Sequence, residues 1–163
     1  MTPSLPLQAW PPSQAGTFEE RNWTAWAKEA LTPLLVGQRV PLPGGGGGEL
    51  RVTELTVTGD ATVAVVRGTP RHGFDFELTL KWSADWEGAE VKGSTVVAEA
   101  SMDTLADGAD ELCLEGKLAD EKKGGAGAGA ALQAARGAAF KAMVHRQIGA
   151  FEQQMRVRLQ GQP

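Results

Sequence analysis

Hydrophobic residues recur at helical spacing in two segments of this chain, and each segment predicts a helix. In residues 22–36, apolar side chains recur every three or four positions, which predicts a helix with Asn22 or Thr24 as its cap. Pro33 lies inside this pattern and lacks a backbone N–H, so we expect the helix to kink or end near it. The same spacing in residues 131–159 predicts a long C-terminal helix with one apolar face.

Between these helices the pattern is typical of β-strands. Residues 74–82 alternate strictly between apolar and polar side chains, as a strand with one buried face does. Residues 50–57 change phase between Val52 and Leu55, which predicts a β-bulge. This part of the chain therefore forms a sheet with one apolar and one polar face.

Three more strands are expected at residues 61–67, 91–100 and 111–118, with a turn at Gly59-Asp60. Strands so closely spaced favour antiparallel pairing, because parallel neighbours need long crossover connections. The helices then cover the apolar face of the sheet. The predicted fold class is α+β: an antiparallel meander sheet with an N-terminal helix and a long C-terminal helix packed on it.

The remaining segments lack periodicity. Residues 1–17 are rich in proline and are expected to form an extended or disordered leader to a single domain over residues 18–160. The glycine tract at residues 44–48 lacks the Lys-Ser/Thr pair of a phosphate-binding loop. The second tract, residues 124–129, has no later strand that offers a ribose-binding acid. Both tracts are interpreted as linkers.

Composition excludes several classes of function. The 163 residues carry 16 Lys+Arg and 20 Asp+Glu, a net charge of −4 that argues against nucleic-acid binding. One cysteine and two histidines predict neither a disulfide nor a metal site, and we expect no cofactor. No apolar run reaches the roughly 18 residues of a membrane span, so we expect a cytoplasmic protein. No nucleophile-base pair or other catalytic constellation is recognisable, so we expect no enzyme activity.

Acidic residues are concentrated in one segment. Eight acidic side chains and a single lysine, Lys117, lie between residues 99 and 121. Such a run is either a solvated surface or a surface that complements a basic partner and accelerates encounter with it.

Six short segments, taken in order, carry a family resemblance: FEERNWTAWAKE (18–29), GELRVTEL (48–55), GDA (59–61), FDFELTLKW (74–82), VKG (91–93) and ADEL (109–112). Together they resemble the N-terminal domain of the activator of heat-shock protein 90 ATPase, a cochaperone family. The resemblance spans about residues 18–159.

The resemblance implies a non-enzymatic cochaperone of α+β fold. It would act as a monomer that binds the middle domain of heat-shock protein 90 and stimulates its ATPase activity, with the ATP held by the chaperone. The second domain of the family has no counterpart here, so the chain is either a single-domain relative or a piece of a longer protein.

The resemblance also implies partner-binding residues. The basic motif of the family falls on residues 66–69, where only Arg67 is basic and Arg71 is a nearby substitute. The aromatic leader of the family falls on residues 14–18, where Phe18 is the aromatic residue that remains. Acidic residues that would meet the chaperone are Asp60, Glu99, Asp103, Asp107 and Asp110.

Two other hypotheses remain open from the sequence. A small-ligand-binding or carrier domain would place Met143, Met155 and the tryptophans around a pocket between sheet and helix, although a packed core explains the same residues. A scaffold that binds the chaperone without stimulating it would follow from the reduced basic motif.

Overall fold

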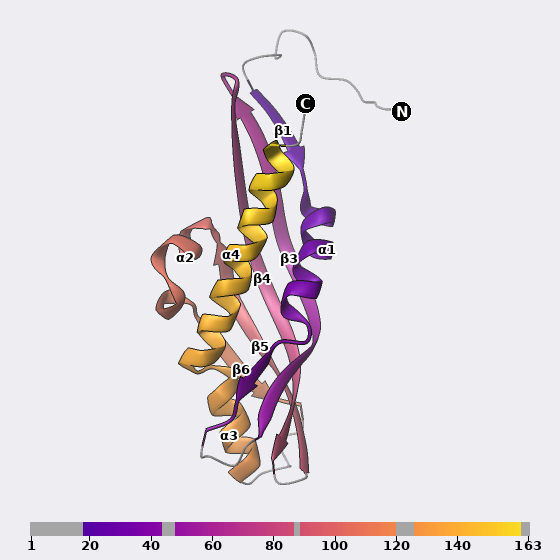
Figure 1. Ribbon diagram of the computed structural model, residues 1–163, viewed down its shortest axis with the longest axis vertical. Coiled ribbons are helices and arrows are strands. Elements are labelled where there is room, and N and C mark those ends of the chain that lie inside the picture. Colours follow the sequence, from indigo (N-terminus) through magenta and orange to yellow (C-terminus); the bar gives the residue numbers. More distant parts are fainter. Residues whose placement is uncertain (1–17, 44–47, 87–88, 120–125, 161–163) are drawn as a thin grey trace.

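A long antiparallel hairpin organises the computed structural model, which describes residues 18–43, 48–86, 89–119 and 126–160 (Figure 1). The hairpin strands are β3, Glu49–Val66, and β4, Thr69–Trp86. On one side of the hairpin the sheet continues from β4 to β5, Ala89–Ser101, and then to β6, Leu114–Leu118. On the other side, β3 pairs with two short strands, β1, Phe18–Asn22, and β2, Arg39–Pro41. Every pairing is antiparallel.

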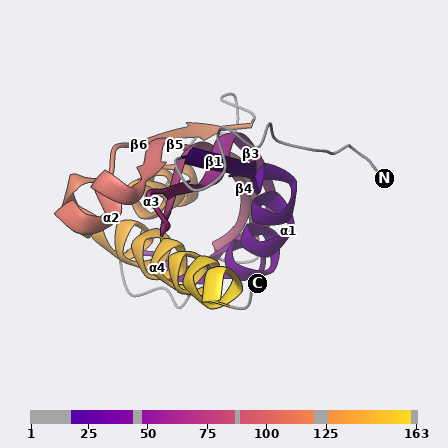
Figure 2. The same cartoon turned by 90° about the horizontal axis from the view of Figure 1, so that it is seen from above.

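The helices gather on the apolar side of this sheet. They are α1, Thr24–Leu35, α3, Ala126–Ala135, and α4, Ala138–Gln160. A short helix, α2, Met102–Asp107, and a 3₁₀ turn, η2, Ala109–Glu111, connect β5 to β6 beside α4 (Figure 2). The predicted α+β class, the antiparallel meander and the helix at each end of the chain are therefore confirmed.

The expected turn at Gly59-Asp60 is wrong. Both residues lie inside β3, where Asp60 pairs with Asp75, and the chain reverses only at Arg67-Gly68. Gly59 is needed for another reason: its φ is +116°, and a Cβ there would lie 2.2 Å from the Asp75 carbonyl oxygen. The predicted bulge is confirmed by a register shift between Val52 and Glu54.

The single C-terminal helix that periodicity predicts is interrupted. α3 ends at Ala135 and α4 begins at Ala138. The Ala135 carbonyl accepts a hydrogen bond from Thr95 Oγ1 at 2.8 Å, and Thr95 Oγ1 in turn accepts one from Trp82 Nε1 at 3.0 Å. The strands thus bind a carbonyl group at the very point where the helical run breaks.

Local chemistry explains the other element ends. The predicted cap of α1, Asn22 or Thr24, is wrong: the N-cap position is Trp23, which makes no side-chain capping hydrogen bond, and Asn22 Oδ1 instead accepts a hydrogen bond from the Thr24 backbone N–H at 2.8 Å. α1 ends two residues after Pro33. Ser101 caps α2 through a capping box with Thr104, a helix that the hydrophobic pattern did not predict. Because η2 occupies residues 109–111, β6 begins at Leu114 rather than at residue 111.

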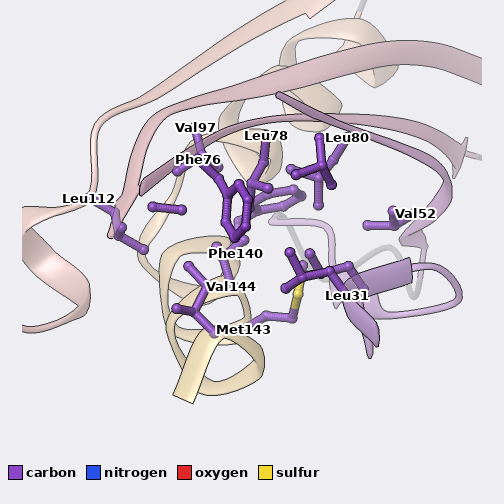
Figure 3. Close-up of a cluster of buried hydrophobic side chains, with 14 of the residues drawn as sticks. Leu31, Val52, Phe76, Leu78, Leu80, Val97, Leu112, Phe140, Met143 and Val144 are labelled. Atoms are coloured by element: carbon purple, nitrogen blue, oxygen red, sulfur yellow. The ribbon is translucent and has the colours of Figure 1, made fainter. Parts of the chain in front are cut away.

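The core lies between the sheet and the helices. Phe76, Leu78 and Leu80 of β4 are all at most 2% exposed and meet Phe140 of α4 and Leu31 of α1 (Figure 3). Their neighbours in the sequence point the other way, so the opposite face of the sheet is polar and open to solvent. That open face carries Asp60, Arg71 and Glu99 of the predicted partner-binding residues, whereas Asp103, Asp107 and Asp110 lie on α2 and η2.

Candidate functional site

Acidic side chains meet on the open face of the sheet because of the strand register. Asp60 of β3 pairs with Asp75 of β4, and Asp75 pairs with Ser101 of β5. The Ser101 hydroxyl donates a hydrogen bond to Glu99 Oε2 at 2.8 Å. The register thus links Asp60 to the acidic segment of the sequence across three strands. Asp60 itself lies inside β3 and not in the turn that the sequence predicts.

The acidic segment continues from Glu99 into α2 and η2. Asp103 and Asp107 are exposed on α2, and Asp110 is exposed on η2. We call these six residues the acidic surface: Asp60, Asp75, Glu99, Asp103, Asp107 and Asp110. Asp75 was missed by sequence reasoning, because its closeness to Asp60 depends on a continuous hairpin that the supposed turn at residues 59–60 would have ended.

The negative charge of the acidic surface is not neutralised internally. Within the described residues, the ion pairs join other groups, for example Arg39 to Glu49 and Lys81 to Glu54, and none includes a member of the acidic surface. Like charges that face each other across paired strands, as Asp60 and Asp75 do, are destabilising. A basic partner would relieve this repulsion.

The predicted basic residues lie at the tip of the hairpin. Arg67 and Gly68 form its two-residue turn with φ values of 52° and 80°, and positive φ at both positions is the pattern of a type I′ turn. Arg71 follows on β4 opposite Ala64, and both arginines are exposed. Phe18 begins β1 and pairs with Val66, so the structure brings Phe18, Arg67 and Arg71 to one end of the molecule.

The hairpin tip and the acidic surface are separate. Arg67 follows Asp60 by seven residues, which at about 3.3 Å per residue corresponds to about 23 Å along the strand. A partner that contacts both must therefore present an extended surface.

A buried charge cluster fastens α4 to the hairpin below this tip. Glu152 of α4 is only 5% exposed, and its Oε2 atom lies 2.6 Å from both His72 Nε2 of β4 and Arg156 Nε. Because a carboxylate only accepts hydrogen bonds, both nitrogens are donors. Burial raises the pKa of Glu152, but the hydrogen bonds and charges of Arg156 and His72 outweigh it and bring the pKa below its ordinary value of 4.5.

The last turns of α4 also contact α1. The Arg158 guanidinium lies 5.0 Å from the ring centroids of both Trp23 and Trp26, within range of cation–π attraction. The Trp26 and Phe151 rings lie 5.8 Å apart. This end of the molecule is therefore held together by α1, α4 and the hairpin at once.

The pocket expected for a small-ligand carrier does not involve the predicted methionines. Met143 and Met155 are at most 3% exposed and are part of the packed core. A hollow of about 540 Å³ lies instead on the open face of the sheet, lined in part by Arg51, Lys81 and Lys92. In the described part of the chain, no three metal-ligating side chains gather, and no helix is long and apolar enough to span a membrane.

Comparison with known proteins agrees with this architecture. Residues 20–158 match the family described as Activator of Hsp90 ATPase, N-terminal. The chain belongs to this family. No curated protein sequence matches the chain. Its fold is similar to the crystal structure of Aha-1 from Plasmodium falciparum, with a TM-score of 0.68 and 17% identity over 85% of this chain and 88% of that chain.

Membership of the Hsp90 ATPase activator family confirms the resemblance drawn from the sequence, and the Plasmodium falciparum structure agrees with the predicted fold. The individual partner-binding residues at the hairpin tip and on the acidic surface stay predictions.

Proposed function

We propose that this chain is a monomeric, cytoplasmic cochaperone that binds the middle domain of Hsp90 and stimulates its ATPase activity. The family supports Hsp90 as the partner. The observation that carries the mode of binding is the acidic surface, whose charges have no internal ion pairs within the described residues. Unpaired charges of one sign steer a partner of opposite sign and set its orientation.

The hairpin tip has a second role in this proposal. Arg67 lies in a tight turn that projects it beyond the strands, and Arg71 follows on the same hairpin. A cation held on a rigid element can contact an acidic group of the partner while the acidic surface is docked. Stimulation requires only that the chain bind the hydrolysing conformation of Hsp90 more tightly than the resting one.

The test is the steady-state ATPase rate of purified Hsp90 as this chain is titrated in, with an Hsp90-specific inhibitor to subtract contaminating activity. We expect a saturable rise in rate. Binding to the isolated middle domain is measured in parallel by calorimetry.

The two measurements separate the hypotheses. Binding without a rise in rate would support a scaffold that docks but does not activate. Absence of binding to the middle domain would contradict the proposal altogether.

A further inference from the structure

α2 is too short to be stable without contacts to the rest of the protein. It has six residues, Met102–Asp107, and isolated helices shorter than about 12 residues are marginal in water. Its capping box fixes the N-terminal end, where Ser101 and Thr104 exchange hydrogen bonds. At its C-terminal end, the Gly108 N–H caps the Thr104 carbonyl at 3.3 Å, which leaves the next carbonyl, that of Leu105, to another element.

The side chain of His145, on α4, forms a hydrogen bond to the C-terminal end of α2. His145 Nε2 lies 2.9 Å from the Leu105 carbonyl oxygen, and since a carbonyl only accepts, the ring nitrogen is the donor. Leu105 is in the last turn of α2, whose carbonyls have no partner within the helix. Within the described residues, no backbone N–H outside the helix is bonded to this carbonyl.

Gly149 provides a second contact between α4 and α2. It lies one turn beyond His145 on the same face of α4, and a Cβ at Gly149 would be 3.7 Å from Leu105 Cδ1. The side chain of Leu105 therefore rests over Gly149 while its carbonyl binds His145. Figures 1 and 2 both show α2 alongside α4.

We infer that His145 is a positioning residue of the acidic surface: by fixing α2 on α4, it fixes the placement of Asp103 and Asp107. Both aspartates are exposed to a partner, and His145 acts on docking through their placement. This inference rests on the proposed function.

The experiment compares His145→Ala with His145→Gln, which retains an N–H donor, and with Arg146→Ala, which alters the neighbouring exposed residue of α4. Hydrogen exchange of the amides of residues 106–108 reports the stability of α2. We expect exchange to accelerate about fivefold in His145→Ala, the factor that one net hydrogen bond corresponds to, and to stay near the wild-type rate in the other two variants.

Affinity for the Hsp90 middle domain is measured on the same proteins. We expect His145→Ala to weaken it about threefold to tenfold and His145→Gln to restore it. In a background that carries Asp103→Asn and Asp107→Asn, His145→Ala should cause no further loss, because the charges it positions are gone.

Unchanged exchange in His145→Ala, or a loss of affinity that persists in the neutralised background, would overturn the inference. Failure of the wild-type chain to bind the middle domain is a separate result, which contradicts the proposed function and removes the docking role of His145. Hydrogen exchange still determines, without any partner, whether His145 supports α2.

Discussion

At the residue scale, Glu152 is the one acid of residues 124–163, and it is nearly fully buried. A buried carboxylate without partners would cost several kcal/mol, and His72 and Arg156 offset this by donating to the same oxygen atom. The ionised form of Glu152 therefore strengthens the attachment of α4 to the hairpin.

Glu152→Gln should lower the free energy of unfolding at pH 7 by about 2 kcal/mol, because two charge-assisted hydrogen bonds lose their anion. The free energy of unfolding should also fall at acid pH. Since the folded pKa of Glu152 lies below 4.5, its contribution is complete above pH 4.5 and is lost as pH falls through the folded pKa. Urea denaturation at pH 7 and at several pH values below 4.5 measures both effects.

The control for Glu152 is Glu77→Gln, which removes an exposed acid of β4 and should change stability by less than about 0.5 kcal/mol. If the wild type and Glu152→Gln lose stability equally below pH 4.5, the carboxylate does not stabilise the fold by its ionised form.

Arg67 offers a substitution that separates activity from stability. Arg67→Asn removes the cation but creates an Asn-Gly pair, the preferred sequence for a turn with positive φ at both positions. We expect stimulation of the Hsp90 ATPase to fall severalfold while the melting temperature stays equal or rises. Arg67→Lys keeps the charge and should keep most of the stimulation; full stimulation by Arg67→Asn would refute the role of Arg67.

At the element scale, periodicity predicted what depends on neighbours in the sequence. The strict alternation of residues 74–82 identified both faces of β4, because a strand repeats every two residues. The break before α4 was not predicted, although Gly137 stands in it; the Thr95 hydroxyl that binds the Ala135 carbonyl at the break lies 40 residues away in the chain, where periodicity cannot report it. Gly59 was taken for a turn because glycine permits positive φ equally in turns and in close strand contacts.

The hydrogen bond from Thr95 to the last residue of α3 can be tested by substitution. Thr95→Val keeps the shape of a fully buried side chain but leaves Trp82 Nε1 and the Ala135 carbonyl without their hydroxyl partner. We expect a loss of about 2 to 3 kcal/mol in the free energy of unfolding and a changed near-ultraviolet circular dichroism of the tryptophans. Thr95→Ser, which keeps the hydroxyl, should lose clearly less; equal losses would show that packing of the methyl group dominates.

At the scale of the whole molecule, charges of opposite sign lie on different parts of the structure. The acidic surface lies on the open sheet face, α2 and η2, whereas exposed Arg67 and Arg71 lie toward the hairpin tip, with Arg67 about 23 Å along the strand from Asp60. A rigid body with this distribution favours one orientation on a partner of complementary charge, and the attraction weakens as salt shortens the Debye length.

Neutralisation of the acidic surface should therefore change both affinity and its salt dependence. The triple variant Asp103→Asn, Asp107→Asn, Asp110→Asn should bind the Hsp90 middle domain about tenfold more weakly at low salt, since each exposed contact contributes up to about 1 kcal/mol. It should also respond less to added salt than the wild type does. A control with the same change in net charge, Glu29→Gln, Glu49→Gln, Asp85→Asn, alters exposed acids elsewhere. Equal losses in the two triple variants would mean that net charge, rather than the position of the acidic surface, governs binding.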